Sequence, residues 1–207
     1  MSILLKIMRK SRFLFLIFFY FCQPLFQAVF MINYIKKYLL NNSLKHQKVY
    51  REKVIVSLEQ THTIGLLCQI TDEDSYKDVY SLFSKLHSPK RTIKLMGYID
   101  DKTVPFFCLP QLSADYFCKK HLNWYGKPNF LHLKDFAAID FDILIDFSRN
   151  DLAPLRYLLT VSKAKLIVGA NEHAQDLYDI YFKDETNPDN FQLLKTIHNY
   201  LLKLTGG

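Results

Sequence analysis

Glycine is scarce in this chain, and its scarcity excludes the commonest nucleotide-binding loops. Only 6 of the 207 residues are glycine, and two of these are the last two residues. The others are Gly65, Gly97, Gly126 and Gly169, which form neither G-x-G-x-x-G nor a Walker loop. A dinucleotide-binding enzyme or a P-loop NTPase needs such a loop to bind phosphate, so the sequence predicts no dinucleotide and no nucleoside triphosphate. It indicates no other cofactor.

Paired cysteines are also missing. The 4 cysteines, Cys22, Cys68, Cys108 and Cys118, make no C-x-x-C motif. Their scattered positions do not form a disulfide framework, and we expect Cys68 to be a small buried hydrophobic residue. This usage favours a reducing compartment.

Motifs for metal and nucleophile chemistry are absent too. The sequence contains no H-E-x-x-H and no G-x-S-x-G. Glu172, His173 and Asp176 are ligand types at short spacing, but the start of a surface helix explains them better. We therefore predict no metal site.

Acidic residues are missing from the first 30 positions. The same positions hold four basic residues, Lys6, Arg9, Lys10 and Arg12, which account for most of the formal charge of +7. Nucleic-acid binding requires Lys and Arg clustered on one face, whereas basic and acidic residues in the rest of the chain are nearly balanced. We predict no nucleic-acid partner.

The longest apolar run, Phe13–Ile32, is interrupted only by Gln23, Pro24 and Gln27. A membrane-spanning helix needs about 20 such residues. Three interpretations remain open: an inner-membrane anchor with a cytoplasmic body, a secretory signal that lacks an A-x-A site, or a fully cytoplasmic protein translated from Met31. A membrane is therefore one predicted partner, through residues 13–32.

The sequence divides into a hydrophobic leader (1–30), an amphipathic helix with a linker (31–60) and an α/β domain (61–207). Apolar residues recur at helical spacing after Met31 and predict the buried face of the amphipathic helix: Ile32, Ile35, Leu39, Leu40 and Leu44.

In the α/β domain, short apolar runs alternate with helical patterns. Strands are predicted at 63–70, 92–99, 141–147 and 165–168, and Pro105 marks Val104–Leu109 as an edge strand. Right-handed crossovers make the strand–helix–strand units at 63–99 and 141–168 parallel. The sequence thus predicts an α/β fold, a Rossmann-like three-layer sandwich with a mostly parallel sheet of about four to five strands.

One segment, Asp115–Pro128, is both cationic and aromatic. It contains the candidate ligand-binding residues Lys119, Lys120, His121, Asn123, Trp124 and Lys127. Such residues can hold a phosphate or stack on a ring. The preferred alternative is a helix end and turn in which Trp124 fills the core.

A second set of candidates lies at the carboxyl end of a predicted strand, where parallel sheets bind ligands. Asp146, Ser148 and Arg149 follow the apolar strand 141–147. Asp146 could accept a ligand hydroxyl, although capping of the nearby backbone is the preferred explanation.

Three motifs carry a resemblance to a known family: DYFCKKHLNWYGKP at 115–128, FDILID at 141–146 and SKAKLIVG at 162–169. On these motifs, residues 31–204 resemble a domain-of-unknown-function family associated with Bacteroidota. That resemblance implies no activity, and it favours translation from Met31.

The segment 141–169 is also similar to the N-terminal half of heptosyltransferase-type glycosyltransferases. There, a strand ending in I-D leads through a Leu-rich helix to a basic strand ending in glycine, as in Leu144–Asp146, Leu152–Leu159 and Lys163–Gly169. Those enzymes also need a second Rossmann-like domain, for which this chain has no room.

Three functions follow as hypotheses. The first is a noncatalytic binding or scaffold domain for a small anionic ligand or a protein partner. The second is a glycosyltransferase-like enzyme of cell-envelope carbohydrate metabolism, which requires an open cleft above Asp146. The third is a membrane-tethered accessory protein.

Overall fold

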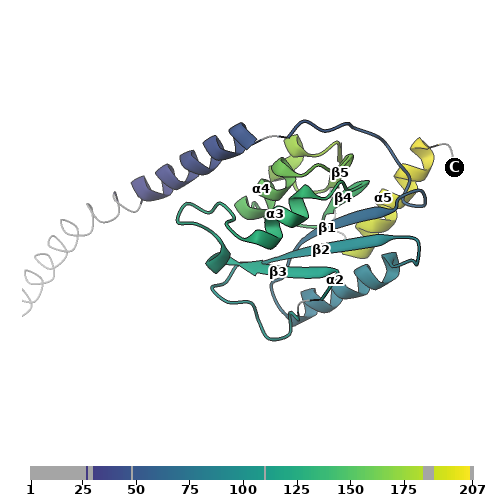
Figure 1. Ribbon diagram of the computed structural model, residues 1–207, viewed down its shortest axis with the longest axis horizontal. Coiled ribbons are helices and arrows are strands. Elements are labelled where there is room, and N and C mark those ends of the chain that lie inside the picture. The colour runs from purple at the N-terminus through teal and green to yellow at the C-terminus, as the bar shows by residue number, and fades with distance from the viewer. Residues whose placement is uncertain (1–26, 28–29, 48, 110, 184–188, 206–207) are drawn as a thin grey trace, which may run out of the picture.

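A sheet of six parallel strands runs through the centre of the molecule (Figure 1). The computed structural model describes residues 27, 30–47, 49–109, 111–183 and 189–205. The first described helix spans residues 30–47. The elements that follow it are β1 (Thr63–Gln69), α2 (Glu73–Leu86), β2 (Thr92–Ile99), β3 (Ala114–Cys118), the 3-10 helix η1 (Lys119–His121), α3 (Leu131–Ala138), β4 (Ile143–Asp146), α4 (Ala153–Val161), β5 (Leu166–Gly169), the 3-10 helix η2 (Glu172–Leu177), β6 (Ile180–Tyr181) and α5 (Asn190–Leu204).

The strand order is β3-β2-β1-β4-β5-β6, and all neighbouring pairs are parallel. The chain builds outward from β1 to β3, returns to the other side of β1, and builds outward again from β4 to β6. This confirms the predicted α/β, Rossmann-like architecture. Winding reverses between β1 and β4, and sheets of this kind bind ligands at the carboxyl edge beside that point.

Two apolar cores cover the two faces of the sheet. Alternation along β4 sends Ile143 and Ile145 into one core and Leu144 into the other, because successive strand residues point to opposite faces. Helices α2 and α5 pack on the first face, and α3 and α4 on the second (Figure 1). The predicted three layers are therefore present.

The sheet differs from the prediction at its edges. Val104–Leu109 is not a strand but an irregular segment with a turn, and the edge strand is β3. We expected β3 to be a helix end because turn-forming residues follow it closely. The two-residue strand β6 is too short for a pattern to predict.

Helix 30–47 contacts the domain more weakly than predicted. Leu40 is 8% exposed and buried, and Leu39 and Leu44 are half-buried. Ile32 and Ile35, predicted to face inward, are exposed. The prediction was wrong for these two residues because the N-terminal end of this helix extends from the body (Figure 1).

The predicted membrane run, Phe13–Ile32, lies almost wholly outside the described residues. Among the residues that are described, no helix combines the length and the apolar character needed to cross a bilayer.

Candidate functional site

The carboxyl edge between β1 and β4, where doubly wound sheets hold nucleotides, is bridged by a contact within the chain. The Asn150 side-chain amide, in the loop after β4, donates to the Gln69 amide oxygen at the end of β1 over 2.7 Å. The start of α2 is filled by its own N-cap, because Asp72 accepts from the Ser75 N–H. Glu73 and Asp74 also lie in the first turn. Their negative charge disfavours a phosphate at this helix end.

Asp146 ends β4 inside the protein rather than on a cleft. Its side chain is 1% exposed. The Tyr178 hydroxyl donates to one carboxylate oxygen over 2.7 Å, and the Ser148 N–H donates to the other over 2.9 Å. Burial raises the pKa of Asp146, although these two donors oppose the shift. The carboxylate is thus held by a buried tyrosine and by the backbone of its own loop.

Gly169 makes the Tyr178 contact possible. A Cβ atom built on Gly169, which pairs with Asp146 across β4 and β5, would lie 2.4 Å from a ring carbon of Tyr178. Only glycine leaves space for the ring to reach Asp146. Asn171 extends the network, because its side-chain amide donates to the Asn150 carbonyl over 2.7 Å and to the Ser148 hydroxyl over 3.3 Å.

Arg149 follows this network in the same loop. It is half-buried, and burial lowers the pKa of its guanidinium, while the nearby charge of Asp146 opposes that shift. Of the three candidates at this strand end, Asp146 and Ser148 are therefore buried in a hydrogen-bonded network and Arg149 borders it.

The cationic segment starts at the end of β3. Lys119 pairs with Asp100 at 3.1 Å, and Lys120 is exposed. His121 accepts from the Cys118 N–H over 3.1 Å, and burial together with Lys120 lowers its pKa. A neutral imidazole with one nitrogen already occupied is therefore favoured.

A tight turn follows, and it places the remaining candidates. The Asn123 side-chain oxygen accepts from the N–H groups of Tyr125 and Lys127, around Gly126 with a φ of 94°. Trp124 is 62% exposed, so the expectation that it fills the core was wrong. Lys127 lies over the Tyr157 ring of α4, with its nitrogen 5.6 Å from the ring centre.

These predicted residues do not meet in one cavity. Parallel strands place the ends of β3 and β4 at the same edge, but β2 and β1 lie between them. The Asp146 carboxylate is covered, and only the turn 123–127 reaches toward the helix that follows β4.

A different pocket lies at the start of α4, and we call it the α4 pocket. It has a volume of about 310 Å³ and is bounded by helix 30–47, the turn 123–127 and α4. Its lining residues are Asn33, Lys36, Lys37, Leu40, Asn41, Leu44, Tyr125, Asp151, Ala153 and Arg156.

Unused positive groups surround the α4 pocket. The Nε atom of Arg156 is buried and has no hydrogen-bond partner among the described residues. One of its terminal nitrogens lies 3.4 Å from Asp151, which is a long contact for an ion pair. The N-cap of α4 is Leu152, whose side chain accepts no hydrogen bond, but Pro154 has no N–H and the N–H groups of Leu155 and Arg156 both donate to the Leu152 carbonyl. The pocket therefore has a basic lining in which Arg156 pairs with Asp151 through one terminal nitrogen and leaves its Nε without an acceptor.

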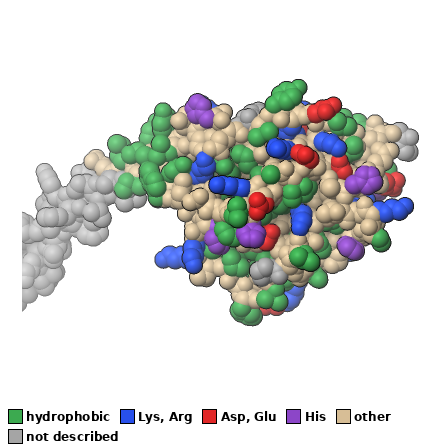
Figure 2. All heavy atoms as spheres, viewed as in Figure 1, with side chains coloured by type: hydrophobic (Ala, Val, Ile, Leu, Met, Phe, Trp, Pro, Cys, Tyr) green, Lys and Arg blue, Asp and Glu red, His purple; other side chains and the backbone are tan. Residues whose placement is uncertain are grey.

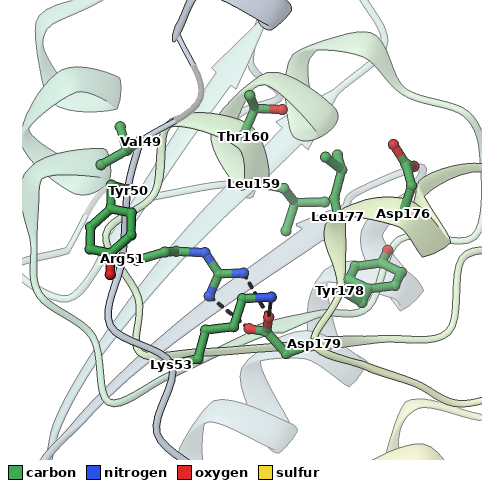
Figure 3. A pocket seen from close by; sticks show the side chains of 10 residues that line it. All are labelled: Val49, Tyr50, Arg51, Lys53, Leu159, Thr160, Asp176, Leu177, Tyr178 and Asp179. Atoms are coloured by element: carbon green, nitrogen blue, oxygen red, sulfur yellow. Dashed lines mark hydrogen bonds and ion pairs between the residues drawn. The ribbon is translucent and has the colours of Figure 1, made fainter.

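A second pocket, of about 250 Å³, is closed by an ion-pair clamp (Figure 3). Arg51 donates to both oxygens of Asp179, over 2.7 and 2.9 Å, and Lys53 lies 2.8 Å from one of them. Burial opposes ionisation of Asp179, but these contacts and the Ile167 N–H hold its pKa below the usual value. Because both Arg51 and Lys53 pair with the one carboxylate of Asp179, the clamp fastens segment 49–53 to the sheet.

Residues 33–204 match a family of unknown function, DUF6913. The chain belongs to the DUF6913 family. No curated protein and no solved structure matches it.

The DUF6913 match spans both walls of the α4 pocket, since it runs from Asn33 in helix 30–47 through Arg156 in α4. Sequence reasoning missed this pocket because its walls are distant in the chain. The one available signal was the adjacent pair Lys36-Lys37 in the amphipathic helix.

The described part of this DUF6913 chain contains no cluster of metal-binding side chains. No group of three or more His, Cys, Asp or Glu side chains there could hold a metal ion. On η2, a carboxylate oxygen of Glu172 and the Nε2 atom of His173 lie 3.6 Å apart. This contact joins two side chains, which are too few for such a cluster.

Proposed function

We propose that this chain binds a small anionic ligand, a carboxylate or phosphate compound, in the α4 pocket. The observation that carries the proposal is Arg156, a cation whose buried Nε has no hydrogen-bond partner among the described residues. Leaving a buried donor unpaired costs about 1–3 kcal/mol, and more for a charged group. An oxyanion would supply the missing acceptor once the Arg156 side chain turns so that this nitrogen faces the pocket.

The charges around Arg156 support the same ligand class. Lys36 and Lys37 line the pocket from helix 30–47, and Asp151 is the acidic residue of its lining. The first turn of α4 adds the positive end of a helix dipole. Planar guanidinium groups bind carboxylate and phosphate through two parallel hydrogen bonds, which suits Arg156 to this role.

The other functions have weaker support. A glycosyltransferase-like role needs Asp146 on an open cleft, and its carboxylate is buried and occupied. The anchor depends on residues 13–32, most of which lie outside the described part of the chain, so it stays a prediction. The candidates of segment 119–127 keep a supporting role, because Tyr125 from their turn forms one wall of the α4 pocket.

Thermal unfolding of the full chain with inorganic phosphate or citrate tests the proposal. A ligand at ten times its dissociation constant stabilises the folded state by about 1.4 kcal/mol. For a domain of this size, that raises the melting temperature by roughly 3–6 °C. We expect Arg156→Gln to abolish the shift and Lys37→Gln to reduce it.

Lys195→Gln is the matched control, because Lys195 is an exposed cation on α5, away from the pocket. Lys37 is also exposed, so its substitution tests binding without disturbing the core. An equal shift in all three variants, or no shift with either anion in the unsubstituted chain, would contradict the proposal.

A further inference from the structure

The part of helix 30–47 that projects from the body carries an unusual apolar surface. Phe30, Met31, Tyr34, Ile35 and Tyr38 are between 43% and 67% exposed. We call these five residues the outer stripe. Figure 2 shows hydrophobic side chains gathered on this projecting end of the molecule.

Helical spacing places the outer stripe on one side. Phe30, Tyr34 and Tyr38 follow one another at intervals of four residues, as do Met31 and Ile35, so all five share one broad face. Leu40 contacts the body from the opposite side of the helix. The helix is therefore apolar on two sides, and the body covers only one of them.

We propose that the outer stripe docks on an anionic lipid surface, with helix 30–47 lying in the plane of the interface. Helices that lie in this way combine a bulky apolar face with flanking lysines. Tyrosine rings favour the boundary between headgroups and acyl chains. Lys45, exposed two turns beyond Tyr38 on the same side of the helix, and Lys37, exposed at the flank of the stripe, supply the charge that complements anionic headgroups, whereas Lys36 is half-buried on the opposite side.

A second copy of the chain fits this surface less well. The stripe covers residues 30–38, about 14 Å of helix. A stable protein interface buries roughly 1,200–2,000 Å², far more than one side of so short a segment. A bilayer has no such minimum, because affinity grows with each apolar side chain that enters it. This inference does not depend on the α4 pocket.

A tryptophan placed in the stripe tests the proposal. The full chain with Trp124→Phe and Tyr34→Trp has its only tryptophan at position 34. It is mixed with vesicles of phosphatidylcholine and phosphatidylglycerol that carry brominated acyl chains. We expect emission to move to shorter wavelength and to fall about twofold, as for a ring at the boundary of headgroups and acyl chains.

The matched control is Tyr200→Trp in the same Trp124→Phe background, because Tyr200 is a 44% exposed tyrosine on α5. We expect little quenching there, and about tenfold weaker partitioning of the position-34 variant into phosphatidylcholine alone.

Three results would overturn the inference. The first is no quenching at position 34, and the second is equal quenching at positions 34 and 200. The third is a concentration-dependent emission shift without vesicles, which would identify a second copy as the occupant. Equal partitioning into both lipid mixtures would remove the anionic surface from the proposal.

Discussion

At the scale of single residues, the buried Asp146–Tyr178 pair determines how the carboxyl edge is built. The Tyr178 hydroxyl is the side-chain donor to a carboxylate that burial has made unfavourable to ionise. Glycine at position 169 is required because the Tyr178 ring occupies the space of its Cβ. The sequence pattern located Asp146 but gave no sign of Tyr178, 32 residues away.

Tyr178→Phe should lower the free energy of unfolding at pH 7.5 by about 1–3 kcal/mol, since it leaves a buried acceptor without its donor. The raised pKa of Asp146 means that the folded state binds the proton more tightly than the unfolded chain does. The cost of ionised Asp146 therefore grows as pH rises through the folded-state pKa, and the loss caused by Tyr178→Phe should shrink at lower pH.

Urea unfolding at pH 7.5 and at pH 5 measures this difference. Tyr181→Phe is the control, because its ring stacks near Tyr178 without a contact to Asp146. A loss as large in Tyr181→Phe as in Tyr178→Phe would show that removing a tyrosine hydroxyl here destabilises the fold without any bond to Asp146, so that the Tyr178–Asp146 hydrogen bond is not responsible.

At the scale of helices and strands, the interior was predictable and the edges were not. Long apolar runs predicted β1, β2, β4 and β5, because a strand buried on both faces is apolar over most of its length. The N-cap of α2 lies at Asp72, with Ser75 as its partner. Asp151 does not cap α4, which starts after Leu152. The α4 pocket could not be predicted, because it depends on where helix 30–47 packs.

Segment 49–53 connects helix 30–47 to the body through the contacts of Arg51 and Lys53 with Asp179. Asp179→Asn removes the charge that holds Arg51 and Lys53, leaving a half-buried guanidinium uncompensated. Breaking a buried pair in this way costs about 3–5 kcal/mol. We expect the cost to appear as local opening, with faster amide hydrogen exchange in residues 30–57 and less change in β1 and β4.

The control for this experiment is Asp176→Asn, an exposed neighbour that lines the same pocket. Uniformly faster exchange across the sheet in Asp179→Asn would show that the clamp stabilises the whole domain rather than one attachment.

At the scale of the whole molecule, two carboxylates hold separate segments on the sheet. Asp179 binds the segment that leads out of helix 30–47. Asp142, just before β4, accepts from the N–H groups of His62 and Thr63 at the start of β1 and pairs with Lys165 at 2.8 Å. Parallel strands bring these distant segments together. Loss of the charge of Asp179 or Asp142 therefore weakens a contact between segments that are far apart in the sequence, rather than a local turn.

Acid should therefore destabilise the fold within a defined range of pH. Burial opposes ionisation of Asp142, but Lys165 and the two N–H donors lower its pKa to about 2, and the pKa of Asp179 is lowered as well. A carboxylate with a lowered folded-state pKa stabilises the protein above its unfolded pKa of about 4, and that contribution is lost as pH falls toward 2. We expect the free energy of unfolding to fall steeply between pH 4 and pH 2, as measured by urea titration at each pH.

Asp142→Asn separates this contribution from the general effect of acid. The variant should lose about 1–2 kcal/mol at pH 7, because its side chain no longer accepts charge-assisted hydrogen bonds. Its stability should then decline less steeply than that of the unsubstituted chain between pH 4 and pH 2, since one titrating group has been removed. Asp74→Asn, an exposed carboxylate on α2, should leave the slope almost unchanged. Equal slopes in Asp142→Asn and the unsubstituted chain would mean that Asp142 ionises with the same pKa in the folded and unfolded states.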